Sequence, residues 1–304
     1  MKILYLLPFL PQLLAAQTLD VRYNQLGDSE KNIANVTSVM VQTSPALNFK
    51  LQRIDARDMV GTTPVNMVTM QTSHKIRALT LGQTVGAATF TNSTELLFTT
   101  VIQKDYVWSQ KHPYNLRLAY DRNVFGIVPN QLRNEIINTA VEADAEIFIK
   151  NKVWVRTFAQ HGQFSDQNVR NILQLDARHY MPTGVFYGTS IYHQTFQNDV
   201  TQDLITRERM YWSPNRFISA EGQVGYKFPW NHTKFAGISY VGMGRQKIHN
   251  IPSQNIYKIH GQLMYKFTEH NSIGVWGNVS NNASNLNGPG YRWGTLGTSV
   301  QVTF

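Results

Sequence analysis

The 304-residue sequence contains no cysteine, few charged residues and no long apolar run beyond its first residues. The absence of cysteine excludes a disulfide-stapled scaffold, a lipid-anchored cysteine and a cysteine-ligated metal site. Asp, Glu, Lys and Arg together make up 15% of the chain, well below the roughly 25% of ordinary soluble domains. Because a membrane-spanning helix needs about 18 or more apolar residues in succession, the lack of such a run excludes a helical membrane protein.

The sequence is instead rich in uncharged polar residues, with 12% aromatic residues and a formal net charge of +9. Strands that turn one face to lipid and the other to water would produce this composition. A basic chain attracts acidic sugars, lipid phosphates or nucleic acid, but no nucleic-acid-binding motif is present. We therefore expect no nucleic-acid partner.

The first sixteen residues, MKILYLLPFLPQLLAA, combine one lysine, a short apolar stretch and small residues at Ala15 and Ala16. This pattern is typical of a secretory signal peptide. The stretch is too short, and too interrupted by Pro8 and Pro11, to span a membrane as a helix. We expect residues 1–16 to be removed on export and residues 17–304 to form one domain.

Apolar and polar residues alternate along most of residues 17–304, which is the pattern of strands and not of helices. In FISAEGQVGYKF (217–228), for example, Ile218, Ala220 and Val224 oppose Ser219 and Glu221. Turn-rich stretches interrupt the alternation and predict about sixteen strands (14–18 possible). Their ranges are 18–25, 33–42, 47–57, 66–77, 81–91, 94–105, 114–123, 134–148, 152–162, 167–179, 184–196, 216–228, 234–245, 256–267, 272–281 and 291–304.

Short turns and longer polar links largely alternate between these strands, and the longer links include residues 125–134, 197–215, 245–255 and 281–290. Outer-membrane barrels have this arrangement, with short periplasmic turns, longer external loops and an even number of antiparallel strands. The sequence thus predicts an all-β transmembrane antiparallel barrel with both termini in the periplasm. Aromatic residues near strand ends, among them Tyr180, Tyr226 and Phe228, would form its interfacial girdles. A soluble β-sandwich is the alternative fold.

The polar faces of the predicted strands carry charges of both signs that would line the lumen. Opposed charges could set a transverse field in an open pore, or could neutralise one another in a closed interior. Trp276, with Trp154 and Trp293, is a candidate inward aromatic over which sugar rings could slide. The candidate lumen-lining residues are Arg117, Asp121, Glu142, Asp144, Glu146, Arg170, Asp176, Arg178, Glu221, Lys227, Lys258, His260, Lys266 and Trp276.

Catalytic chemistry finds little support in the sequence. Ser190 and His193 are three residues apart, so a strand would place them on opposite faces, and no Gly-x-Ser-x-Gly motif is present. Glu142, Asp144 and Glu146 are metal-binding residue types, but a row of acidic residues on a strand favours a charged pore lining. We expect no enzyme activity, no cofactor and no metal.

The final stretch, TLGTSVQVTF (295–304), alternates in the same way and ends on Phe304. It resembles the C-terminal signal of bacterial outer-membrane proteins, which is read by the barrel-assembly machinery. The resemblance implies that the barrel-assembly machinery and outer-membrane lipid are partners. It also implies a location in the outer membrane of a Gram-negative bacterium.

The segment YWSPNRF (211–217) contains Tyr211, Ser213, Pro214 and Phe217. It resembles the entry to a barrel strand in outer-membrane proteins that export cellulose or poly-N-acetylglucosamine, and in the similar domain of a phage adsorption protein. The exporters usually carry a periplasmic helical-repeat region before the barrel, which we do not expect here. The resemblance implies a pore for a biofilm exopolysaccharide, served by a periplasmic or inner-membrane synthase partner. A surface receptor or structural barrel working through residues 197–215, and a general anion-preferring solute porin, are the alternatives.

Overall fold

The computed structural model describes residues 17–28, 32–107, 113–126, 129–150, 152–198, 213–228, 234–249, 251–268, 270–282 and 292–303. The predicted signal peptide, Tyr211 and Phe304 lie outside these residues. Among the described residues, no helix is long and apolar enough to cross a membrane.

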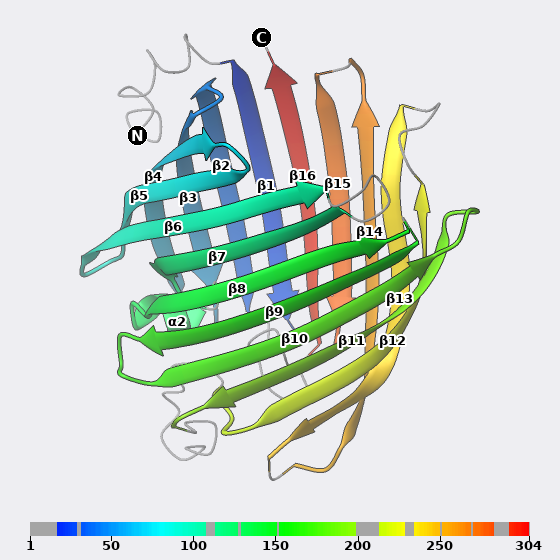
Figure 1. Ribbon diagram of the computed structural model, residues 1–304. Helices are drawn as coiled ribbons and strands as arrows, with labels where there is room; N and C mark the ends of the chain where they lie inside the picture. The colour runs from blue at the N-terminus through cyan, green and yellow to red at the C-terminus, as the bar shows by residue number, and fades with distance from the viewer. Residues whose placement is uncertain are drawn as a thin grey trace.

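Sixteen strands form one closed antiparallel barrel, in which each strand pairs with its neighbours in sequence and β1 closes the sheet against β16 (Figure 1). The predicted barrel is therefore confirmed, and the alternative of a two-sheet sandwich is wrong. Each predicted strand overlaps an observed one. The strands are β1 Thr18–Asp28, β2 Ile33–Ser44, β3 Leu47–Arg57, β4 Thr62–Ile76, β5 Leu79–Thr89, β6 Thr94–Val107, β7 Pro113–Val124, β8 Ile137–Ile149, β9 Val153–Phe164, β10 Val169–Tyr180, β11 Val185–Phe196, β12 Phe217–Phe228, β13 Phe235–Ile248, β14 Gln254–Lys266, β15 Ser272–Ser280 and β16 Trp293–Thr303.

The outer face of the barrel is apolar and open. Leu296, Leu96 and Val224 are 62%, 60% and 57% exposed, and they share this face with many other aliphatic side chains. In water, so large an apolar surface would be strongly unfavourable, whereas hydrocarbon solvates it. The alternation seen in the sequence thus sorts apolar side chains toward lipid and polar ones toward the interior.

Both described ends of the chain lie at the same end of the barrel, because Thr18 of β1 is paired with Thr303 of β16. We call this the terminal end and the opposite one the loop end. At the terminal end β2 and β3 are joined through residues 45–46, and β4 and β5 through residues 77–78. Two pairs of neighbouring strands that the sequence analysis separates by longer links meet at the opposite end: β7 ends and β8 begins at the loop end, and β11 ends and β12 begins there. The location of the terminal end in the periplasm stays a prediction.

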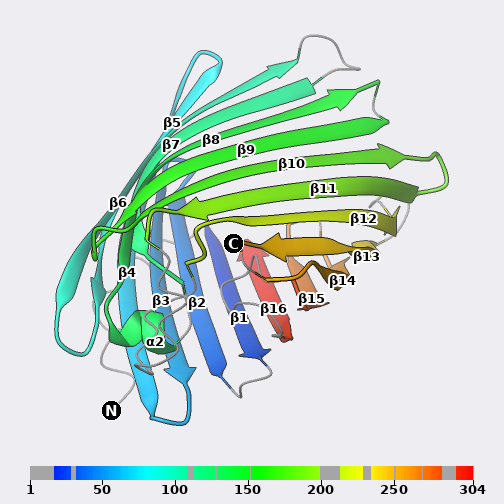
Figure 2. The ribbon, with the colours of Figure 1, turned by 90° about the horizontal axis from the view of Figure 1, so that it is seen from below.

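One long connection differs from the expected external link. Residues 129–133 form a short helix, α2 (Pro129–Arg133), which packs against the inner sides of β3 and β4. Figure 2 shows α2 beside these two strands. The reason lies in one apolar side chain: Leu132 is fully buried in a cluster with Ile54, Val65 and Leu97 of the barrel wall. We call the described residues of this connection, 125–126 and 129–136, the plug segment.

Candidate functional site in the barrel lumen

The residues that contact the plug segment identify the inner face of the barrel. Because directly paired residues on neighbouring strands lie on the same face, the strand register then assigns the inner-face residues of every other strand. Ile54 of β3 lies opposite Val65 of β4, and both pack with Leu132. Following the paired residues from strand to strand places every candidate lumen-lining residue on this inner face. Trp154 and Trp293 lie there as well. Whether these residues act on a cargo stays a prediction.

The acidic row of β8 is neutralised by arginines from the two flanking strands. Arg117 of β7 donates to Glu142 at 3.0 Å. Arg156 of β9 pairs with Asp144 at 2.7 Å and approaches Glu146 at 3.7 Å. These cross-strand pairs form a fixed, nearly balanced charge network on one side of the lumen. In the part of the chain that the structure describes, no group of three His, Asp or Glu side chains could hold a metal ion.

A second part of the inner wall is basic and aromatic. We call Arg178 of β10, Lys227 of β12 and Lys258 of β14 the cationic patch. Arg178 lies over the rings of Trp154, Phe186 and Tyr240, with its Cζ 5.0, 5.4 and 5.3 Å from the ring centroids. The ammonium groups of Lys258 and Lys227 lie 5.6 Å from the Tyr240 centroid and 5.4 Å from the Tyr180 centroid. Cations held over aromatic faces at these distances are stabilised by the ring quadrupole.

Glycines allow these aromatic rings to lie flat against the wall. A Cβ added at Gly225 would lie 2.5 Å from Cζ of Phe186 and 2.6 Å from Cβ of Tyr240. A Cβ added at Gly297 of β16 would run into the ring of Trp276. Because a larger residue at either position would push the ring into the lumen, the glycines keep these aromatic side chains close to the wall.

Three members of the exporter-like motif lie in the described residues, and all are fully buried at the loop end. The carbonyl of Pro214 accepts a hydrogen bond from the backbone N–H of Phe196 at 3.3 Å. Phe217 packs against Ile248 and lies 5.8 Å from the ring of Tyr192. The contacts of Pro214 and Phe217 anchor the chain where it enters β12.

The plug segment is held by polar contacts in addition to Leu132. Arg133 pairs with Asp58 of the β3–β4 connection at 2.8 Å, and the backbone N–H of Asn92 donates to Glu135 at 3.1 Å. Burial favours the protonated form of Asp58. The Arg133 hydrogen bond and the backbone N–H groups of Val60 and Gly61 outweigh that effect, so the pKa of Asp58 is lowered. At neutral pH the pair is therefore fully charged.

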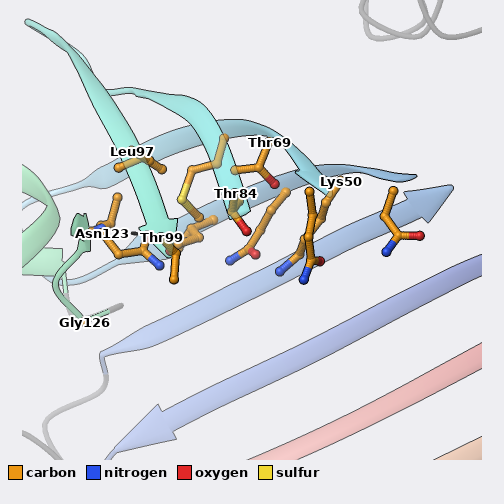
Figure 3. Close-up of a pocket in the computed structure, with 13 residues that line it drawn as sticks. Lys50, Thr69, Thr84, Leu97, Thr99, Asn123 and Gly126 are labelled. Carbon is orange, nitrogen blue, oxygen red and sulfur yellow. Dashed lines mark hydrogen bonds between the residues drawn. The ribbon is translucent and has the colours of Figure 1, made fainter. Parts of the chain in front are cut away.

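Beside the plug segment the inner wall is hollowed into a cavity of about 310 Å³. Figure 3 shows side chains from β3 to β7 around it, including Lys50, Thr69, Thr84 and Thr99. Leu97 and Gly126 border it near the plug segment. The lining is mixed, with amides, hydroxyls and one lysine, and it can hydrogen-bond water or sugar hydroxyls equally well.

The histidine and serine weighed for catalysis do not meet. Ser190 of β11 is paired with Glu221 on the inner face, whereas His193 is paired with Ile218 on the outer face. His161 also lies on the outer face, and it hydrogen-bonds Asn171 at 2.7 Å. The expected absence of a Ser-His pair agrees with this geometry.

Several lumen residues were missed in the sequence. Arg156 is two residues from Trp154 on a predicted strand, so the period of two already predicts that both side chains share the inner face. Tyr240 lies in a stretch with apolar residues on both faces, which hides the alternation. Tyr180, expected in an aromatic girdle, lies instead on the inner face, because it is paired with Phe186 in the continuous β10–β11 register.

No family model matches the chain, and no curated protein matches it. Among solved structures, a protein described as a bacterial polysaccharide outer membrane secretin aligns with a TM-score of 0.71 at 10% identity, covering 95% of this chain and 99% of that one. CdiB from Acinetobacter baumannii aligns with a TM-score of 0.53 at 8% identity, covering 94% of this chain and 60% of that one. At these identities the likeness concerns the fold alone. The chain therefore shares the closed-barrel fold of these outer-membrane proteins.

Proposed function

We propose that the protein is an outer-membrane pore that exports a bacterial exopolysaccharide. The observation that carries the proposal is a series of aromatic and cationic side chains on the inner wall. It begins with Trp154 on β9, includes the cationic patch, and ends with Trp276 on β15; we call it the track. Support comes from the shared fold with a protein whose description names polysaccharide, since the alignment covers nearly the whole of both chains. In this proposal the terminal end faces the periplasm, residues 1–16 direct export, and a synthase partner supplies the polymer and the energy.

A sugar polymer presents apolar C–H faces and hydroxyl edges, and both find partners in this lumen. The partly exposed rings of Trp154 and Trp276 offer stacking surfaces, while the exposed amide of Gln262 on the same face offers hydrogen bonds. Many weak contacts along a wall permit movement, because a cargo must be bound firmly enough to enter and loosely enough to leave. The track suits this requirement better than one deep pocket.

The plug segment supplies a gate in this proposal. It occupies the inner wall of β3 and β4 near the loop end, and its contacts can be released without breaking the strand pairing of the barrel. A pore closed in this way would protect the cell from uncontrolled leakage while no polymer is passing. We therefore expect low ion conductance from the resting protein.

Single-channel recording of the refolded protein in a planar bilayer tests the proposal. We expect small or rare openings at rest, larger openings when residues 129–133 are replaced by a Gly-Ser linker, and block of those openings by an added polysaccharide. A matched control replaces residues 181–184, in the tight β10–β11 turn at the terminal end, and should leave conductance unchanged. A barrel that stays silent after plug replacement would contradict the pore and favour a receptor or structural barrel.

The cationic patch also favours a second candidate, the anion-preferring solute porin. That function requires steady conductance at rest and no block by long sugar chains. In a salt gradient, the reversal potential should be shifted toward the equilibrium potential of the anion. The same recordings separate the two candidates, because only the exporter needs the plug segment to move.

A further inference from the structure

The inner wall carries ion pairs between β7, β8 and β9, and a group of three cations of a different kind on β10, β12 and β14. On β7 to β9 the arginines Arg117 and Arg156 form ion pairs with carboxylates of β8. Within the described part of the chain, the cationic patch of Arg178, Lys227 and Lys258 forms no ion pair with a carboxylate. Glu221, the acidic residue of β12, accepts a hydrogen bond from Gln223 instead. The patch is thus a group of three positive charges that, within the described residues, holds no carboxylate of the wall in an ion pair.

Arg178 has hydrogen-bonding capacity that its surroundings do not use. Its Nε is buried and has no hydrogen-bond partner among the described residues. The rings of Trp154, Phe186 and Tyr240 surround its guanidinium group and fix its position without neutralising its charge. A preorganised guanidinium is the group that best matches a planar carboxylate, which it can bind through two parallel hydrogen bonds.

The lysines extend this arrangement across the wall. Tyr240 joins two members of the patch, because Arg178 and Lys258 both lie over its ring. His260 is paired with Tyr240 across β13 and β14, and its ring centroid lies 4.9 Å from that of Tyr240. An acidic sugar unit could therefore place its carboxylate on a cation while its ring stacks on a partly exposed aromatic side chain beside the patch, such as Trp154 or Tyr180.

We propose that the cationic patch binds the carboxylates of an anionic sugar polymer, so that the exported polysaccharide is acidic and not neutral or basic. This inference rests on the proposed export function and names the chemical class of its cargo. A neutral polymer would use the aromatic rings but would leave three fixed cations without a role. A basic polymer would be repelled by them.

Binding of an oligogalacturonate to the refolded protein in detergent, measured by isothermal titration calorimetry, tests the inference without requiring conduction. The neutral reference is the methyl ester of the same oligosaccharide, which keeps the sugar rings and removes the charge. We expect the acid form to bind at least about tenfold more tightly than the ester, because a charge-assisted hydrogen bond contributes more than one power of ten in affinity. Equal binding of the two forms would overturn the inference.

Substitutions locate the site. Lys258→Gln and Lys227→Gln should each weaken binding of the acid by about tenfold and leave binding of the ester unchanged. Lys75→Gln removes an inner-face lysine of β4, far around the wall from the patch, and serves as the matched control. The lysine variants of the patch carry the test because Arg178→Gln would also disturb its three aromatic contacts. Loss of affinity in Lys75→Gln equal to that in Lys258→Gln would show a diffuse charge effect and contradict the site.

The two proposals fail in different ways. Charge-dependent binding that is lost in Lys258→Gln, together with a barrel that never conducts, would keep the acidic-sugar site and remove the export pore. A conducting barrel blocked equally by the acid and its ester would keep the pore and remove the acidic-sugar site.

Discussion

The helix α2 of the plug segment buries one apolar side chain against the barrel wall, so Leu132→Ala should loosen the helix while the barrel stays folded. Leu132 is 0% exposed and packs in the apolar cluster with residues of β2 to β6. Truncating a buried leucine to alanine costs about 2–5 kcal/mol. The Arg133–Asp58 pair, whose side chains are 37% and 12% exposed, contributes at most about 1 kcal/mol. The leucine therefore contributes more than this ion pair to holding α2 against the wall.

The loss of even 2 kcal/mol corresponds to about a 30-fold rise in the open population of the plug segment. Three backbone hydrogen bonds report on opening, from the N–H groups of Phe125, Glu135 and Ile136 to carbonyls within the segment. Hydrogen exchange of these amides in detergent, read by mass spectrometry, should accelerate by about that factor. Amides of the barrel strands should exchange as in the parent protein.

Leu118→Ala is the matched control, because Leu118 is a leucine of the adjacent strand β7 that lies on the outer face and is 48% exposed. It removes the same atoms without touching the plug segment, and it should leave exchange at Ile136 unchanged. Unaltered exchange in Leu132→Ala, or equal acceleration in both variants, would refute the reasoning that the buried leucine closes the segment.

Other outcomes follow from single contacts. The pKa of Asp58 is lower in the folded protein than its unfolded pKa of about 4, so its pair with Arg133 stabilises the plug segment at pH values above that unfolded pKa. This stabilisation is lost only when the pH falls through the lower folded pKa. Hydrogen exchange of the plug amides should therefore become faster, relative to unprotected amides, only at pH values well below the unfolded pKa. Gly297→Ala should cost about 1–3 kcal/mol in unfolding free energy by overpacking, measured by urea denaturation, whereas Gly261→Ala, with open space around it, should not. Phe217→Ala, which empties a fully buried site at the entry to β12, should cost about 3–5 kcal/mol in the same assay.

The barrel was predictable because lipid and water impose a period of two on every strand. FISAEGQVGYKF shows this directly, since its alternate residues lie on the outer and inner faces as the pattern predicts. Where the alternation of one strand is weak, the number of strands can still be counted from the clearer strands on either side, because barrels of this kind close with an even number of strands. The ends of strands were less predictable, and Tyr180 was consequently assigned to a girdle.

The pairing of charges was not predictable, because it depends on register. The sequence shows Glu142, Asp144 and Glu146 on one face, but not that Arg117 and Arg156 lie within reach of them on the flanking strands. If one strand were shifted along its neighbour by two residues, other side chains would lie opposite the acidic row. No pattern within a single strand determines this register. The same reason hides the contact of Arg178 with Tyr240, which lies three strands away.

The inward fold of the plug segment left only a faint signal. Residues 125–134 are turn-rich and read as an external link, yet they include Phe125 and Leu132, which are apolar residues with no reason to face water. Leu132 is buried in a hydrophobic hollow built by five other strands, and Phe125 packs with Phe164 and Phe196, so their burial depends on residues far away in the sequence. Apolar residues in a supposed external loop are the signal to look for.

The central claim, that a sugar polymer passes through this lumen, is tested most directly by release of a labelled polysaccharide from proteoliposomes. Vesicles containing the barrel with residues 129–133 replaced by a linker should release an entrapped fluorescent oligogalacturonate, while protein-free vesicles retain it. Vesicles that equilibrate small ions and still retain the labelled polymer would contradict export and identify a small-solute pore.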